Sequence, residues 1–459
     1  MPLLIEIQGP MSGTTFKTDS SFEFRSDSSF IWEANDGIMR LSTENFAGQY
    51  FWSADILNIE PIAWRADNLH GGMCRVSGMG SIEIAMTAFD ELGWWFPQTS
   101  YPCTIYYTST DEGAATVLLP CTLHLSEINP PKSFRYDIYP ENYDVDVLTE
   151  ATNYDGETVV LPLALGTVTH VNPVRLADAG GGNQRYSAGG ITGTKGATWY
   201  VYDDGVDICA NATEISGNVF ELSVAPVGEV TISGTNSNLE YLEDIFTYFC
   251  SSSYLNLNLV NAETTATAVD RWVTQQIRVI DFLSNVAASQ AWFFFIINGS
   301  MYVRIYTGYA TTKVIDVETD ALDGTHYFMP QPISSLKYAW VKREAVEETV
   351  GKFVKSTDQE EVVTSSYPYG AQIEVDVFSE TRSVVNTRLQ VIEGYQLIQQ
   401  ISLSLPFTGE LILPGTELTV SDRRFTGRET SGVDGYVRDV IYDFMSKKVT
   451  LEGHVNYYN

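Results

Sequence analysis

Short runs of β-branched and aromatic residues, separated by glycine, asparagine, aspartate and proline, most limit what this chain can fold into. Examples are Ser81–Met86, Cys103–Thr108 and Thr116–Leu125. The run residues suit the pleated surface of a sheet, and the residues between them favour turns. In the first run Ile82 and Ile84 alternate with polar neighbours, which predicts one buried and one solvated face. The pattern favours a mainly β chain.

The apolar spacing changes to three and four residues after Asn238, which indicates helices. Leu239, Leu242, Phe246 and Phe249 share one helical face, and Asn238 can cap the first turn. Two further stretches show the same amphipathic spacing, through Ile277, Ile280, Leu283 and Ala287, and through Val385, Leu389 and Ile392. A smaller α+β region therefore interrupts the β pattern.

Several strands are expected in the second half of the chain. The runs 292–297 and 301–306 flank Asn298-Gly299, which predicts a tight hairpin. Further strands are predicted at Ile401–Phe407, Leu418–Ser421, Gly435–Tyr442 and Lys448–Val455.

A chain of 459 residues is expected to hold several separate cores. Pro130 and Pro131 cannot donate ladder hydrogen bonds, so a domain edge is predicted beside them. We expect several small β-barrel or sandwich domains. Their predicted bounds are an N-terminal β-barrel at 1–128, a β-rich middle domain at 129–237, an α+β domain with helices and a hairpin at 238–324, and a C-terminal β-barrel with a helix at 325–459.

Two motifs invite a ligand-binding interpretation. The glycine-dense stretch from Ala179 to Gly196 lacks the spacing of a phosphate-binding loop and predicts an extended or mobile surface loop. Asp203–Asp207 has the carboxylate density of a calcium loop without its alternating ligands, so a turn is the favoured interpretation.

The net charge of -31, from 58 acidic and 27 basic residues, argues against a protein that binds nucleic acid by neutralising phosphates. This sign of charge would suit a wall past which DNA slides without sticking, because phosphates are repelled. Solubility or a salty habitat is an equally good explanation.

The sequence shows no convergent set of reactive residues. The five cysteines form no C-x-x-C pair, so buried thiols are expected. The histidines show no metal-ligand spacing, and His170 in a strand-like run is interpreted as a core or interface residue. There is no G-x-S-x-G motif, and Trp94-Trp95 suggests a packed corner more than a sugar platform. We predict no enzyme, and no catalytic, cofactor-binding or metal-binding residue.

No apolar run approaches the ~20 residues that span a bilayer. The segment Met1–Pro10 does not resemble a secretory signal. Synthesis in the cytoplasm without stable membrane association is therefore expected.

Taken in order, several segments resemble the tail hub family of long-tailed bacteriophages, over most of the chain. The order of the segments is the stronger signal, because each one alone is an ordinary strand, turn or helix. The segments are Leu161–His170, Val201–Val206, Leu239–Tyr306, Leu413–Leu418, Asp439–Phe444 and Lys448–Leu451.

The resemblance implies a homotrimer in which each chain contributes two tube-type β-barrels, near residues 1–128 and 325–459, to one ring. It implies a structural virion protein at the tail tip that joins the tail tube and distal tail protein ring to tip or central fibre proteins. Such a hub lines part of the DNA-ejection channel, retains the tape-measure protein and touches DNA only in passing.

Two alternatives stay open. A distal-tail adaptor would form a hexamer with one tube barrel and an attached carbohydrate-binding module, although the helical middle block favours the hub. A tail-associated glycan-binding protein or polysaccharide hydrolase would use exposed aromatic residues and an acidic surface.

Overall fold

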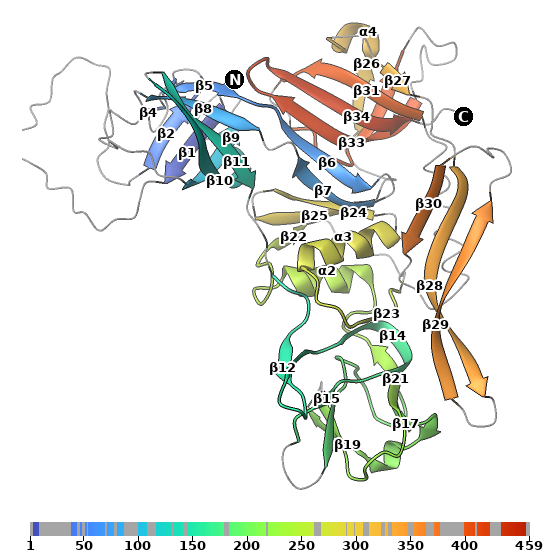
Figure 1. The fold of residues 1–459 in the computed structure, drawn as a ribbon. Helices are drawn as coiled ribbons and strands as arrows, with labels where there is room; N and C mark the ends of the chain where they lie inside the picture. Colours follow the sequence, from blue (N-terminus) through green and yellow to red (C-terminus); the bar gives the residue numbers. More distant parts are fainter. Residues whose placement is uncertain are drawn as a thin grey trace, which may run out of the picture.

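The computed structural model of the chain is mainly β, as predicted, with a small helical layer at its centre (Figure 1). Backbone is described for residues 3–8, 38–43, 46–47, 51–52, 54–68, 71–77, 80–86, 100–107, 116–130, 132–140, 143, 145–178, 183–216, 219–260, 268–290, 292–297, 299–305, 312–322, 326–328, 333–347, 352–363, 371–376, 399–408, 411–422 and 433–455.

A seven-stranded antiparallel sheet forms the N-terminal module, and its first and last strands are β2 and β5. Ile82 and Ile84 are fully buried in β8 while Glu83 between them is not, which confirms the predicted alternation. The strands, in spatial order, are β2 (Ile38–Ser42), β1 (Leu3–Gln8), β9 (Ser100–Tyr107), β10 (Thr116–Asn129), β11 (Ser133–Pro140), β8 (Ser81–Ala85) and β5 (Ile56–Ile59).

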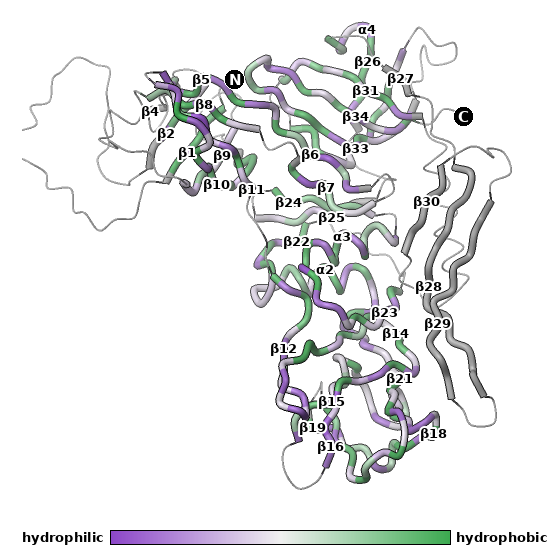
Figure 2. The backbone as a smooth tube through the Cα atoms, viewed as in Figure 1, coloured by the Kyte–Doolittle hydropathy of each residue, from purple (hydrophilic) through white to green (hydrophobic). Residues whose placement is uncertain are grey.

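An eleven-stranded sheet combines strands from both ends of the chain, and we call it the C-terminal module; it and the N-terminal module are the two β modules. Figure 2 shows hydrophobic and hydrophilic residues alternating along several of its strands. All four predicted C-terminal strands are present. Its main path is β22 (Asn258–Val260), β25 (Ser300–Ile305), β24 (Trp292–Ile297), β7 (Gly71–Ser77), β6 (Ile62–Asn68), β33 (Val433–Asp443), β34 (Lys448–Val455), β31 (Gln399–Pro406) and β27 (His326–Phe328), with β32 (Glu417–Ser421) on β33 and β26 (Thr312–Asp316) on β32.

Strand pairing crosses the predicted domain boundaries. The hairpin of β10 and β11 spans residue 128, and Pro130 lies in its turn, where Lys132 N donates to Asn129 O. Strands β6 and β7 come from the predicted N-terminal domain but pair with β33 and β24. The division into four domains stays a prediction, and Pro130 marks a turn within a sheet.

Strand β24 separates two hydrophobic cores. Phe293, Phe295 and Ile297 belong to the core of the two β modules, while Trp292 and Phe294 belong to the core beneath the helices. Successive strand residues point to opposite faces, so a strand buried on both sides must be apolar throughout. The predicted hairpin is confirmed: β24 and β25 pair antiparallel around Gly299, whose φ is positive.

Two of the three predicted helices are present on this second core. Helix α2 (Leu242–Cys250) buries Leu242, Phe246 and Phe249, and α3 (Val279–Ser289) buries its apolar side against β7 and β24. The predicted start at Asn238 is wrong, because Tyr241 is the N-cap and Asn238 lies in the preceding turn. The helix predicted through Val385 and Ile392 lies outside the described residues, whereas α4 (Val317–Asp320) is a single short turn.

A middle region of two small sheets extends away from the helices (Figure 1). It has its own core, separate from the other two. One sheet is β18 (Val206–Asp207), β17 (Tyr200–Asp203), β21 (Val230–Asn236), β14 (Leu163–Val171) and β23 (Arg271–Val273); the other is β15 (Arg175–Leu176), β16 (Gln184–Ser187), β20 (Val219–Leu222) and β19 (Ala212–Ser216), with the 3-10 turn η2 (Cys209–Asn211) nearby.

Residues 184–191 of the glycine-dense stretch belong to this core, which corrects the predicted surface loop for that part, whereas Gly193 and Gly196 are exposed and residues 179–182 lie outside the described residues. Residues 184–187 form β16, and Ala188 and Ile191 are buried. Gly189 has a φ of +61°, and a Cβ there would lie 2.3 Å from the Trp272 ring. The glycine therefore permits close packing at a left-handed position.

Three smaller sheets complete the fold. Strand β28 (Ile333–Glu347) pairs antiparallel with β29 (Lys352–Val363) and parallel with β30 (Ala371–Asp376), and this long ribbon runs beside the middle region in Figure 1. The two remaining pairs are β3 (Phe46–Ala47) with β4 (Phe51–Trp52) and β12 (Glu150–Thr152) with β13 (Thr158–Val160).

Candidate assembly surfaces

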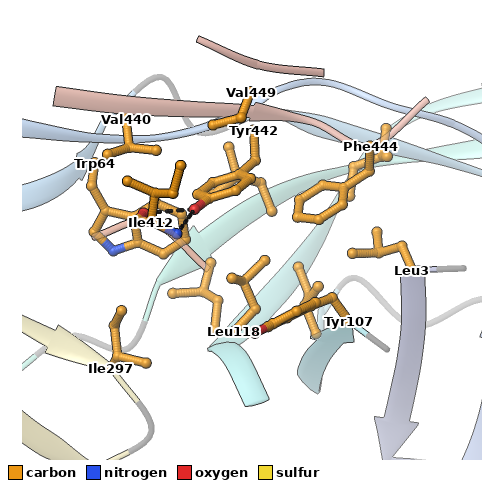
Figure 3. Packing of buried hydrophobic residues seen from close by; sticks show 14 of the residues in the cluster. Leu3, Trp64, Tyr107, Leu118, Ile297, Ile412, Val440, Tyr442, Phe444 and Val449 are labelled. Carbon is orange, nitrogen blue, oxygen red and sulfur yellow. Dashed lines mark hydrogen bonds between the residues drawn. The ribbon is translucent and has the colours of Figure 1, made fainter. Parts of the chain in front are cut away.

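The two β modules share one hydrophobic core, shown in Figure 3. Tyr107 of β9 lies 5.8 Å from Phe407, measured between ring centroids, and Phe407 lies 5.4 Å from Tyr442 of β33. Trp64 of β6 meets the same Tyr442 ring edge-on at 5.9 Å. Aromatic pairs at these separations add to the free energy of burying their area. The N- and C-terminal modules therefore form one packed block.

Tyr442 also fixes a connecting segment inside this block. Its hydroxyl accepts from Ile412 N at 2.7 Å and donates to Ile412 O at 2.6 Å, as the dashed lines in Figure 3 mark. Both groups are buried, and leaving either without a partner would carry a desolvation penalty. Residue 412 is thereby held against the shared core just before β32.

A buried carboxylate, Asp439 of β33, pairs with its neighbour Arg438 and joins β33 to β6 through a hydrogen bond. Asp439 is 4% exposed and accepts from Ala66 N at 2.8 Å. Arg438 donates to the Asp439 carboxylate at 2.6 Å and lies 3.5 Å from Glu452 of β34. A carboxylate with both an ionic partner and an amide donor is tolerated in a core. The hydrogen bond between Ala66 N and Asp439 connects strands from opposite ends of the sequence.

A second polar group links the β6–β7 hairpin to α3. Arg75 donates to Asp67 at 2.9 Å and to Asp281 at 2.6 Å, while Ser284 Oγ accepts from Met73 N and donates to Asp67. These two carboxylates hold the pKa of Arg75 above its ordinary value against the opposing effect of burial, the largest single influence.

A hollow of about 540 Å³ lies beside this group, between β7, β10, β11 and α3. Its lining is mostly apolar, with Arg75, Arg278 and Asp281 among its charged members. Arg75 and Asp281 pair with each other at its edge. This ion pair braces β7 against α3.

Two edge strands of the block expose apolar side chains. Strand β5 pairs only with β8 and β26 only with β32 among the described strands. Leu57 on β5 is 46% exposed, and Val314 on β26 is 65% exposed. An unpaired strand edge with apolar side chains is a template for pairing with another chain. These edges are the best candidates for contacts between copies.

The acidic turn in the middle region is a structural clamp. Asp203 accepts from both Val227 N and Gly228 N at 2.7 Å, and Asp207 accepts from Cys209 N at 2.8 Å. Asp204 accepts from Glu229 N at 3.1 Å. The carboxylates satisfy backbone amides of neighbouring turns, as Asp commonly does. No group of three or more potential metal ligands gathers anywhere in the described part of the chain.

The histidines are dispersed. His170 is half-buried in a bulge of β14 with a φ of 49°, and its ring lies 4.4 Å from that of Tyr202. His454 is buried and its Nδ1 lies 2.6 Å from Tyr436 Oη. Burial, and then the charge of Arg438, lower the pKa of His454 to about 3. A neutral imidazole in a core satisfies one hydroxyl and does not transfer protons near neutral pH.

All five cysteines are free and buried, as predicted. Trp94 and Trp95 lie outside the described residues. None of the described helices has the length and apolarity needed to cross a bilayer.

Sequence reasoning missed Asp439, Arg75 and Trp64, the residues that join distant segments. Only the position of Asp439 next to Arg438, between apolar residues of the run Tyr436–Tyr442, gave any signal of a buried charge.

Comparison with protein-family models and with curated proteins gives no match. Among solved structures, the chain is similar to a tail protein from Neisseria meningitidis MC58, at 8% identity and a TM-score of 0.41, covering 87% of this chain and 93% of that one. It is also similar to the 43 kDa tail protein of prophage MuSo2 from Shewanella oneidensis, at 9% identity and a TM-score of 0.42, covering 90% and 98%.

A third similar chain comes from the virion of a native gene transfer agent particle, at 11% identity and a TM-score of 0.46, covering 69% of this chain and 88% of that one. At TM-scores below 0.5 these likenesses do not assign the chain to a family.

Proposed function

We propose that this chain is a structural virion protein, the trimeric hub at the distal end of a bacteriophage tail tube. The observation that carries the proposal is the pair of β modules sharing one core, since a chain with two such modules lets three copies supply six units to a ring. In this role it connects the tube and distal tail ring to tip or central fibre proteins and lines part of the ejection channel.

The open edges support assembly from several copies. Leu57 and Val314 lie on strands whose outer side has no partner among the described strands. Closing a ring covers such edges without leaving new ones, because every copy offers the same pair of surfaces. A hub of this kind is stable chiefly as an assembly.

The charge supports a channel role. An excess of 31 negative charges repels phosphate, so DNA and the tape-measure protein pass or rest without a strong electrostatic well for nucleic acid. In the middle region, Asp203 and Asp204 accept from backbone amides and Glu221 pairs with Arg185, and these bracing contacts support a structural role for them.

Particle mass and ring symmetry test the proposal. The purified chain, followed by light scattering and negative-stain microscopy, should reach three times its 51.1 kDa protomer mass and form threefold rings. Leu57→Glu with Val314→Glu should shift it toward monomers, because charge on an edge opposes pairing.

Val227→Glu is the matched control, since Val227 is 98% exposed but lies in the middle region. This variant should still form rings. A monomer at high concentration would refute the proposal, and sixfold rings would support the distal-tail adaptor in its place.

A further inference from the structure

Two of the five cysteines face each other across neighbouring strands. Cys103 of β9 and Cys121 of β10 are direct partners in the antiparallel register. Both belong to the shared β core, at 4% and 6% exposure. Directly opposite residues project from the same face of a sheet, so the two side chains are neighbours. Cys74, Cys209 and Cys250 lie on other elements.

The spacing of such a pair suits a covalent bond. Opposite residues of an antiparallel ladder have Cα atoms about 4.5 or 5.5 Å apart, depending on the hydrogen-bonding position. Disulfides form at Cα separations of roughly 4.4–6.8 Å, so either position is within range. Neither strand would have to move far for the sulfurs to bond.

The two thiols already interact. Burial raises the pKa of Cys103 well above its ordinary value, and a hydrogen bond with Cys121 raises it further. A thiol held in the neutral form reacts slowly, because the thiolate is the attacking species. Cys103 is therefore a slow nucleophile, and joining the two thiols requires a two-electron oxidant.

We propose that Cys103 and Cys121 form a latent disulfide site that a small two-electron oxidant of the azo or disulfide class closes. With an azo compound, the two S–H bonds break and one S–S bond forms. The two hydrogen atoms, carrying two electrons, pass to the N=N group, which becomes a substituted hydrazine. The site concerns the chemistry of the chain itself and is independent of the proposed hub role.

The disulfide would cross-link two neighbouring strands in the middle of the N-terminal module. Strands β9 and β10 lie at the third and fourth positions of the seven-stranded sheet. They also carry Tyr107 and Leu118, which belong to the core shared with the C-terminal module. A cross-link between them restricts the unfolded chain and should raise the unfolding midpoint of the oxidised protein.

Oxidation of the full chain with diamide, an azo compound, tests the site. The reduced protein is treated under native conditions, freed of oxidant, denatured and alkylated, and its intact mass and peptides are measured. We expect three alkylated cysteines in place of five, and one cross-linked peptide pair containing Cys103 and Cys121. The thermal midpoint should rise and return to its starting value after reduction.

Single variants sharpen the result. Cys121→Ala should retain four alkylatable thiols and show no rise in midpoint, whereas Cys250→Ala, which removes a buried but solitary thiol, should keep the cross-link. Five alkylated cysteines after prolonged oxidation would overturn the proposal. So would a bond between another pair, or a cross-link that survives in Cys121→Ala.

Discussion

The block of two β modules and the middle region differ in how far apart in the sequence their contacting segments lie. In the block, the Asp439 carboxylate meets Ala66 N across 373 positions of sequence, and strands from both termini share one sheet. In the middle region, β14 to β21 assemble a core from nearby segments, with Trp272 as the main distant contribution. The comparison indicates that the block closes only after most of the chain exists, whereas the middle region can form locally.

The block and the middle region also differ in what lies at their outer ends. The block ends in exposed strand edges that carry Leu57 and Val314, while the middle region ends in a turn clamped by Asp203. Edges suit contact with copies of the chain, and a clamped turn suits a surface that can vary without disturbing the fold. Substitutions that affect one region and spare the other would sharpen this comparison.

The largest effects should come from truncating each core. Trp64→Ala in the block and Phe220→Ala in the middle region each remove a buried ring and should cost about 3–5 kcal/mol. Hydrogen exchange with mass spectrometry should show faster exchange in β6, β7, β33 and β34 for the first, and in β16, β17 and β20 for the second. Equal loss of protection in both regions for either variant would contradict independent cores.

The next effect concerns Asp439, whose ion pair with Arg438 lies within β33 and whose hydrogen bond with Ala66 N joins β33 to β6. Asp439→Asn removes the charge partner of Arg438 but keeps an acceptor for Ala66 N, and should cost about 2–3 kcal/mol. In chemical denaturation, the variant should lower the unfolding midpoint of the block and leave that of the middle region unchanged. The control is Glu452→Gln, whose exposed side chain lies farther from Arg438 and should matter much less.

Acid should destabilise the block through His454. Its folded pKa of about 3 lies below the ordinary 6.5, so between these values the unfolded chain takes up a proton that the folded chain does not. Stability should therefore be intact above pH 6.5 and fall as the pH drops toward 3, by up to about 1.4 kcal/mol per pH unit.

His454→Gln tests this assignment by urea denaturation at several pH values. The variant should lose the His454 share of the slope while remaining folded at pH 7. A slope unchanged by the substitution would show that other groups dominate the acid response.

The smallest effect should come from the clamped turn. Asp203→Ala removes two hydrogen bonds, to Val227 N and Gly228 N, from an exposed loop and should cost about 1–2 kcal/mol. Protease cleavage near residue 227 should accelerate while the block is unaffected. Accelerated cleavage within β33 would contradict the separation of the two regions.

Much of the fold could be predicted from the sequence. The alternation at Ile82 and Ile84 depends only on which side chains seek the core, and the Asn-Gly turn before β25 depends only on local backbone preference. Asn238 does not cap the helix, because it lies in the preceding turn and the helix begins at Leu242. Residues 184–191 of the glycine-dense stretch are not a surface loop, because Trp272, about 80 residues away, packs on Gly189.

The candidate surfaces were less predictable. Nothing local distinguishes Leu57 or Val314 from the buried residues beside them, because exposure depends on which strand ends a sheet. The pairing of Cys103 with Cys121 depends on the register of two strands, and a slip of one residue would send the side chains to opposite faces.

Residue type and short-range spacing are enough to specify the β character of the chain, its two central helices, its acidic charge and its buried thiols. The core shared by both ends of the chain, the separation of two cores by β24 and the open strand edges emerge only in the folded chain. Burial and strand pairing between distant segments are properties of the assembled sheet, and no single segment carries them.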